Sequence, residues 1–441
     1  MLAQVGFPIL LHLVGCLLST GFKRSPDAAF TWLSGIFWGL ALWVTWAVIV
    51  LSLGVPFTAL VMFGGMVLLA LSMAWTLGRR KSFDRNDLLW FVLSTAIIAT
   101  AATLAANFNH TAASFDSFTQ ILIGKELAHH RGFDPDVHAA LASWGVFTPA
   151  VQAAAVLINV DYLSALWPTM GVAFLCCFVP LCMRVAVAAG APTWFAILSA
   201  EIGAAFLATT YFFTFQCFYI HNNLPSAIYL LFAVATMWLA LQTGRRSWLI
   251  FSTASFFTFT LLRTEAPLFV VVFMAPVWCA SDLDRRTRLK CMLPLTLAIL
   301  AWYAKLLTLI GGGTEILSPN KAIALMGLMV IATLVAALPD RPWRRLLAEL
   351  VPWLMMIAGA LAMVAIIWRQ PRIMQDSLEA IAENLFFQGG WGWTWAFVVA
   401  LLGLSIALPR IARQEVWTVG LGLFWMLVFV LAVFRENPYR T

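Results

Sequence analysis

Acidic residues and histidines gather in one segment of this chain, residues 107–162. The segment contains the stretch FDSFTQILIGKELAHHRGFDPDVH, which begins at Phe115 and places Asp116 second. A carboxylate within about 3 Å of an acceptor hydroxyl can remove its proton as a general base. The same carboxylate also suits a helix cap or a solvated position, so the sequence leaves these roles for Asp116 open.

A possible metal site follows in the same segment. Asp134, Asp136 and His138 form an Asp-x-Asp-x-His group. Carboxylate and imidazole ligands this close together can bind a divalent cation, for which Mg²⁺ and Mn²⁺ are the candidates. The Asp-Pro step at Asp134 is equally typical of a turn, so the cofactor remains open.

Other polar residues of the segment are candidates for substrate binding. His129 and His130 are adjacent and could contact a phosphate or donate a proton. Glu126 and His138 lie in the same stretch. The alternative for the histidine pair is an ordinary solvated loop.

Basic residues and one histidine elsewhere are further substrate-binding candidates. Arg263 suits phosphate recognition or an ion pair with Glu265 in the short turn LRTE. Lys305 could bind a lipid phosphate or extend to the membrane interface from its apolar stretch. His221 precedes an apolar run, where it could reach a substrate, although helix capping is the default role there.

A second polar segment, residues 369–390, opens with two arginines. Arg369 and Arg372 are natural partners for a phosphate or diphosphate group.

These residues belong to a chain with the composition of a polytopic membrane protein. Of its 441 residues, 62% are hydrophobic and only 11% are charged, whereas an ordinary soluble domain has about 25% charged residues. This composition excludes a soluble enzyme, a disordered chain and a disulfide scaffold. The net charge of +7 indicates basic cytoplasmic loops rather than a nucleic-acid partner.

The apolar stretches predict an all-α protein with about fourteen transmembrane helices. Each stretch approaches or reaches the roughly 17–25 residues that a spanning helix requires. The predicted spans are 5–22, 28–51, 55–77, 87–106, 163–186, 192–213, 223–242, 247–262, 265–280, 290–311, 321–338, 347–368, 391–409 and 415–434.

The basic residues predict the orientation of these helices. Most of the 27 Lys and Arg residues fall in alternate loops, which the positive-inside rule places in the cytoplasm. Both termini and segment 107–162 then face outward. The predicted organisation is a single transmembrane domain, 1–441, in which four helices (1–106) precede the outward loop 107–162. Ten further helices follow in 163–434, with a second outward loop at 369–390.

The apolar stretch 139–160 within the long loop is predicted not to cross the membrane. Counting it as a span would invert every later loop and place the basic clusters outside. We therefore expect a re-entrant or interfacial helix, interrupted by Gly145 and Pro149.

The layout of residues 100–280 resembles that of GT-C glycosyltransferases, integral membrane enzymes that use polyprenyl-phosphate sugars. The resemblance rests on the stretch from Phe115 to His138, which is similar to their first periplasmic loop with its juxtamembrane helices. The turn Leu262-Arg263-Thr264-Glu265 is also similar to a feature of many members. This chain differs in having three additional helices before the loop. It also has Ser117 after Asp116 where an acidic pair is common.

The resemblance implies an inverting glycosyltransferase that moves a sugar from a polyprenyl-phosphate donor to a lipid or glycan acceptor. It places Asp116 as the catalytic base and the active site on the periplasmic side of a bacterial inner membrane. Two alternatives stay open: an O-antigen ligase or polymerase-type enzyme with a diphosphate-linked donor, and a transporter or flippase of lipid-linked glycans.

Overall fold

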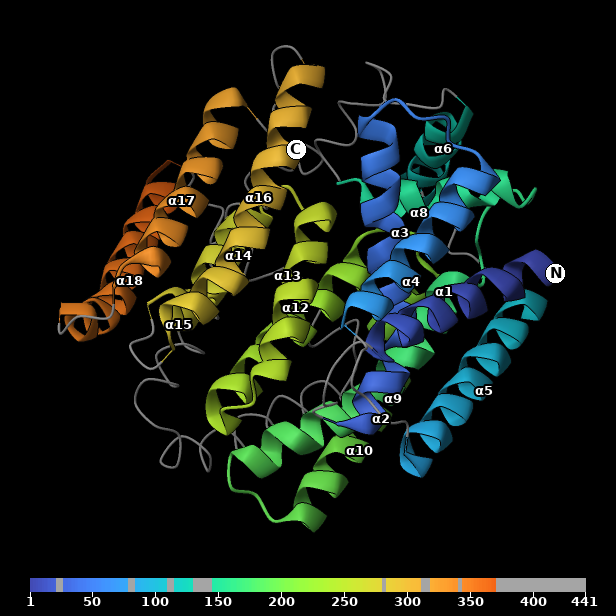
Figure 1. The fold of residues 1–441 in the computed structure, drawn as a ribbon, viewed down its shortest axis with the longest axis horizontal. Coiled ribbons are helices and arrows are strands. Elements are labelled where there is room, and N and C mark those ends of the chain that lie inside the picture. Colours follow the sequence, from blue (N-terminus) through green and yellow to red (C-terminus); the bar gives the residue numbers. More distant parts are fainter. Residues whose placement is uncertain are drawn as a thin grey trace. The chain divides into compact units, whose positions relative to one another are not determined.

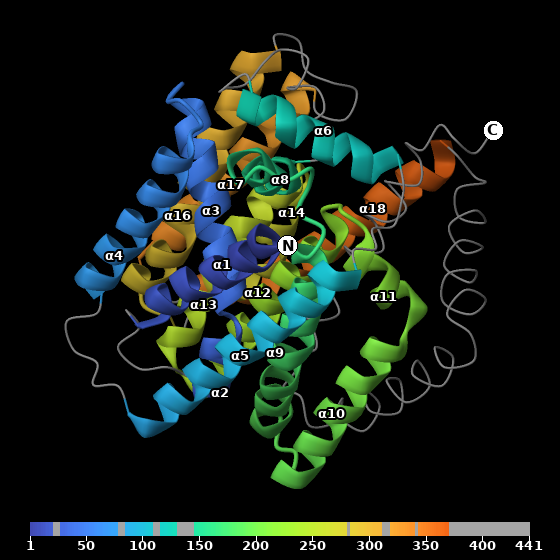
Figure 2. The same ribbon diagram turned by 90° about the vertical axis from the view of Figure 1, so that its right-hand side faces the viewer.

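The computed structural model describes residues 1–20, 27–77, 84–108, 115–129, 145–279, 283–310, 318–339 and 343–369. Every regular element within these ranges is a helix, which confirms the predicted all-α class (Figures 1 and 2). The helices are α1 (Leu2–Thr20), α2 (Ala28–Leu33), α3 (Gly35–Ser52), the π-helical turn η1 (Leu60–Gly64), α4 (Gly65–Leu77), α5 (Arg85–Phe108), α6 (Phe115–His129), α8 (Phe147–Leu157), α9 (Leu166–Ala188), α10 (Thr193–Thr209), α11 (Tyr211–Phe218), α12 (Asn223–Thr243), α13 (Arg246–Leu262), α14 (Ala266–Phe273), α15 (Ala275–Trp278), α16 (Arg285–Ile310), α17 (Pro319–Ala337) and α18 (Trp343–Arg369).

Seven of the described helices are long and apolar enough to cross a membrane: α1, α3, α5, α9, α12, α16 and α17. This supports a membrane protein, while the number fourteen stays a prediction. The predicted span 265–280 is divided into α14 and α15, which meet at Met274 just before Pro276. Proline has no N–H to continue a helical hydrogen-bond ladder, which favours a break there. The predicted spans 391–409 and 415–434 lie outside the described residues.

The described helices group into two compact units. One contains residues 1–209, 213–266 and 297–326, and the other contains residues 210–212, 267–296 and the described residues from 327 onward. All side chains of the candidate site below belong to the first unit.

Glycines bring α1 and α3 into close contact in the first unit. A methyl group at Gly39 would lie 1.8 Å from the backbone oxygen of Leu11, and one at Gly15 would lie 1.7 Å from that of Gly35. No side chain fits between backbones at such distances. Small residues of this kind are common where membrane helices cross closely.

The short helix α8 is held against α3 and α6. Trp43 Nε1 on α3 donates to the backbone oxygen of Ala150 at 2.9 Å. A methyl group at Gly124 of α6 would lie 2.8 Å from the backbone oxygen of Pro149, so these two helices also pack closely. With eleven residues, α8 is about 16 Å long, which is too short to cross a hydrocarbon core of about 30 Å alone.

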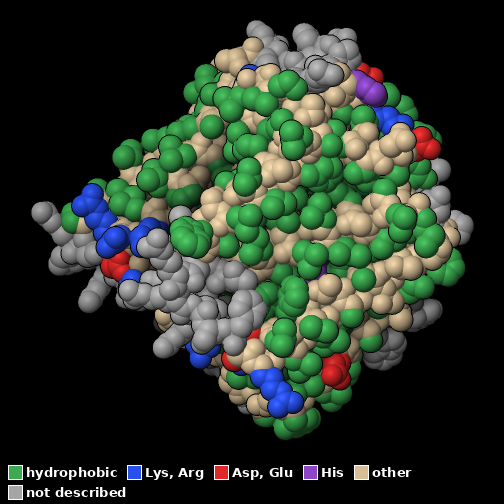
Figure 3. All heavy atoms as spheres, turned by 45° about the vertical axis from the view of Figure 1, so that its right-hand side comes forward, with side chains coloured by type: hydrophobic (Ala, Val, Ile, Leu, Met, Phe, Trp, Pro, Cys, Tyr) green, Lys and Arg blue, Asp and Glu red, His purple; other side chains and the backbone are tan. Residues whose placement is uncertain are grey.

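Hydrophobic side chains dominate the described surface on the face drawn in Figure 3, where charged side chains form only small groups. The exposed face of α5 illustrates this composition: Leu88, Leu89 and Val92 are 56%, 62% and 57% exposed. An apolar helix surface of this kind is typical of contact with lipid.

Candidate functional site

Asp116 is joined to a residue 103 positions later in the chain. It lies in the first turn of α6, and its Oδ2 accepts a hydrogen bond of 2.6 Å from the hydroxyl of Tyr219. Tyr219 follows the end of α11 and is 9% exposed. The bond holds one oxygen of the carboxylate and so fixes the direction of the group.

An aromatic stack places His221 next to this pair. The rings of Tyr219 and His221 are 5.3 Å apart, with an angle of 14° between their planes. The ring of Phe215 also stacks on that of Tyr219, at a distance of 5.3 Å. Trp167 Nε1 donates to the backbone oxygen of His221 at 3.1 Å. The imidazole is therefore held by the stacked ring of Tyr219 and by its own backbone.

Arg263 contributes a cation to the same part of the unit. It caps the end of α13 in an extended conformation, with Nη2 donating to Asn223 Oδ1 at 2.7 Å and Nε donating to Ser226 Oγ at 3.1 Å. Glu265 lies 4.0 Å from Nη1, and the side chains of Arg263 and Glu265 are 33% and 25% exposed. The ion pair expected from the sequence thus sits at the limit of contact, so the guanidinium is held mainly by neutral acceptors.

Three chain segments converge to build this arrangement. Asn222 Oδ1 accepts from the backbone N of Thr148 at 3.2 Å and from its hydroxyl at 2.5 Å, which caps the first turn of α8. Val146 N donates to the backbone oxygen of Leu261 at 3.0 Å. The start of α8, the α11–α12 connection and the end of α13 are consequently tied together.

Glycine is required at residue 145, where the start of α8 meets the end of α13. Gly145 has a φ of +79°, and a methyl group there would lie 2.5 Å from the backbone oxygen of Leu262. Both the backbone conformation and the space exclude a side chain.

Burial keeps His221 neutral near physiological pH. Desolvation lowers its pKa from 6.5 to about 4, and the nearby charge of Arg263 acts in the same direction. The charge of Asp116 and a hydrogen bond to Asn223 oppose this change without cancelling it. A neutral imidazole can donate one hydrogen bond and accept another.

We expect acidification to destabilise the protein through His221. Between pH 6.5 and about 4 the unfolded histidine binds a proton that the folded one does not, so stability is lost as the pH falls through this window. Thermal unfolding in detergent at pH 7.5 and pH 5 should show a smaller pH difference for His221→Asn than for the parent chain. His129→Asn is the control, because it removes a histidine that is exposed at the end of α6. An unchanged pH difference in His221→Asn would refute this role.

The structure brings together three of the residues predicted from the sequence: Asp116, His221 and Arg263. Sequence reasoning missed Tyr219 and Ser226, which hold Asp116 and Arg263. Neither residue belongs to a motif. The only available signal for Tyr219 was its position in an aromatic stretch two residues before His221.

Three other predicted residues lie apart from this cluster. Glu126 and His129 are ten and thirteen residues beyond Asp116 on α6, or about 15 and 20 Å along its axis. Lys305 is half-buried on α16, two residues after Tyr303, whose hydroxyl donates to the backbone oxygen of Thr264. Two helical residues separated by about 200° point to opposite sides, so Lys305 faces away from that contact.

The remaining predictions fall where their side chains are not described. His130, Asp134, Asp136, His138 and Arg372 lie outside the described residues, as does the side chain of Arg369 at the end of α18. Within the described ranges, no group of three or more His, Cys, Asp or Glu side chains could hold a metal. The predicted site at Asp134 and Asp136 stays a prediction.

Buried polar atoms without a described hydrogen-bond partner occur on the elements that build the cluster. Both carboxamide atoms of Gln120, one turn after Asp116 on α6, are of this kind, as is Nδ1 of His221. On α8, Gln152 uses its oxygen to accept from Leu163 N at 3.0 Å, but its Nε2 is also without a described partner. An unpaired buried polar group costs about 1–3 kcal/mol, which a ligand rich in hydroxyl groups would offset.

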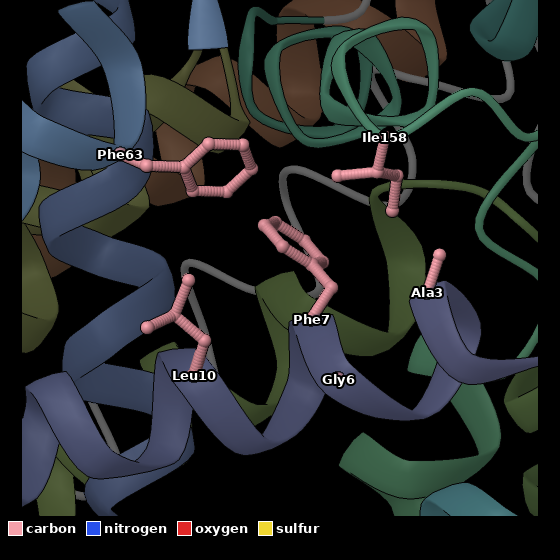
Figure 4. A pocket seen from close by; sticks show the side chains of 6 residues that line it. All are labelled: Ala3, Gly6, Phe7, Leu10, Phe63 and Ile158. Carbon is pink, nitrogen blue, oxygen red and sulfur yellow. The ribbon is translucent and has the colours of Figure 1, made fainter. Parts of the chain in front are cut away.

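An open apolar pocket of about 260 Å³ lies in the same unit (Figure 4). Figure 4 shows the rings of Phe7 and Phe63 on one side and Ile158, just after α8, on the other. The two rings are 6.2 Å apart in an edge-to-face arrangement. Ala3, Gly6 and Leu10 of α1 complete the lining, which offers almost only hydrocarbon to a ligand.

No family model, curated protein or solved structure matches this chain.

Proposed function

We propose that this protein is a membrane glycosyltransferase of GT-C type. It transfers a sugar from a polyprenyl-phosphate donor to a lipid or glycan acceptor on the periplasmic side of a bacterial inner membrane. The observation that carries the proposal is the cluster of Asp116, His221 and Arg263. Tyr219 orients the carboxylate of Asp116 and stacks on His221, and the charges of Asp116 and Arg263 both act on His221.

Each charged group of the cluster has a defined task in an inverting transfer. Asp116 takes the proton from the acceptor hydroxyl, and the acceptor oxygen forms a bond to the anomeric carbon on the face opposite the phosphate. The bond between that carbon and the phosphate oxygen breaks, and its electron pair stays on the phosphate. Arg263 stabilises the added negative charge on the phosphate. It is suited to this role because it pairs only weakly with Glu265, at 4.0 Å.

The neutral groups supply binding of the sugar. The imidazole of His221 and the carboxamide of Gln120 can exchange hydrogen bonds with sugar hydroxyls. The apolar pocket at Phe7, Phe63 and Ile158 has the chemistry required for part of an isoprenoid chain.

The donor class tests the proposal directly. The full-length protein, reconstituted in liposomes, would receive radiolabelled sugars on a polyprenyl monophosphate or a polyprenyl diphosphate, together with a lipid extract as acceptor. We expect label to move to the acceptor from the monophosphate donor only. Transfer from the diphosphate donor alone would favour the ligase or polymerase-type enzyme. Movement of intact donor across the bilayer without transfer would identify a flippase.

A further inference from the structure

The first turns of α16 in the second unit form a surface that is half basic and half apolar. An open pocket of about 640 Å³ is lined by Arg285, Arg286, Leu289, Lys290, Leu293 and Pro294. On a helix with 100° per residue, all of these except Pro294 fall within about 140° of the circumference. Cationic head groups and apolar side chains therefore share one face.

The cations on this face lack anionic partners among the described residues. Arg285, Arg286 and Lys290 are exposed, and the ion pairs of the described part of the chain involve other arginines, Arg184 and Arg263. Asp284 is engaged as the cap of the helix, where its carboxylate accepts from Thr287 N at 2.8 Å and from the Thr287 hydroxyl at 3.0 Å. Asp284 caps the positive end of the helix, and the three cations beside it outnumber this acid, which makes the described surface attractive to an anion.

The opposite side of the same helix is firmly anchored within its unit. Arg288 is fully buried, and its Nε and Nη2 donate to the backbone oxygens of Ala336 and Leu338, each at 3.1 Å. Its Nη1 donates to the backbone oxygen of Leu283. Arg288 thus supports the end of the helix, and only the other three cations remain available for a ligand.

We propose that this face of α16 binds the headgroup of an anionic phospholipid. The lipid phosphate lies among Arg285, Arg286 and Lys290, and an acyl chain follows Leu289 and Leu293 along the helix. Two observations favour a lipid over a soluble anion: the apolar half of the pocket, and its position at the end of a helix long enough to span a membrane. Basic clusters next to spanning helices recognise anionic headgroups in this way.

Lipid titration of the full-length protein in neutral detergent tests the inference, with phosphatidylglycerol and phosphatidylcholine as probes and native mass spectrometry as readout. We expect phosphatidylglycerol to bind more tightly, and Arg285→Gln/Arg286→Gln to weaken it by about fivefold for each cation removed. Leu293→Gln should weaken it without changing the charge. Arg285→Lys/Arg286→Lys should retain binding, which shows that any loss in the glutamine variant comes from charge rather than misfolding.

A matched control separates a defined site from general attraction. Arg245 and Arg246 are also adjacent, exposed and located at a helix start, so Arg245→Gln/Arg246→Gln removes the same charge elsewhere. This variant should bind phosphatidylglycerol like the parent chain. An equal loss in both double variants, or displacement of phosphatidylglycerol by millimolar inorganic phosphate, would overturn the proposal.

Discussion

Asp116→Asn should reduce sugar transfer by about 10²–10⁴-fold, the usual contribution of a general base. The substitution removes the proton acceptor but keeps the shape of the side chain and an oxygen that can accept from the Tyr219 hydroxyl. The contact between α6 and residue 219 should therefore survive. Initial rates with the monophosphate donor, measured in liposomes at equal protein amounts, provide the test.

Two further variants distinguish a catalytic carboxylate from a structural one. Tyr219→Phe deletes the hydrogen bond that Asp116→Asn can keep, but it retains the carboxylate, so its rate should fall less than that of Asp116→Asn. Asp161→Asn neutralises an exposed carboxylate elsewhere in the same unit and should leave the rate unchanged. If Asp116→Asn retained the rate of the parent chain, Asp116 would not be the base and the proposed mechanism would fail.

The helical class followed from the sequence because long apolar stretches with few charges can satisfy their backbone only as helices in a membrane. Breaks inside such stretches were harder to locate. The division between α14 and α15 falls at Met274, within a uniformly apolar run. Pro276 was the signal, but a proline is also tolerated inside a helix, as Pro180 is in α9. Neighbouring packing decides between these outcomes, and a single sequence does not contain it.

The site was partly predictable for a similar reason. Asp116 stood out in a segment rich in acids and histidines, and His221 stood out because it precedes an apolar run. Arg263 stood out because ionisable residues next to apolar stretches are uncommon and costly. Their meeting depends on contacts between distant segments, such as the bond from Thr148 to Asn222. Lys305 satisfied the same sequence criterion, but the helical phase of α16 turns it away from Tyr303. Spacing within one helix is readable from the sequence, whereas the rotation of that helix against its neighbours is not.

The close crossing of α1 and α3 leads to the largest expected effect on stability. Gly39→Ala should lower the free energy of unfolding by about 1–3 kcal/mol or more, the range for overpacked interiors. Its methyl group would lie 1.8 Å from the Leu11 oxygen and 2.5 Å from the Leu11 carbonyl carbon. These are backbone atoms, so relief requires moving a whole helix rather than turning a side chain. Thermal unfolding in a fixed detergent would measure the change.

Gly6→Ala is the matched control, since Gly6 lies on α1 and a methyl group there would have nothing within 4 Å. Alanine favours a helix over glycine by up to about 1 kcal/mol, so this variant should be as stable as the parent chain or more so. The same intrinsic gain acts at Gly39, and a loss there must come from the crossing alone. Equal melting temperatures for Gly39→Ala and Gly6→Ala would mean that α1 and α3 do not approach through Gly39. The spacing Gly35-x-x-x-Gly39 would then serve another purpose than close helix packing.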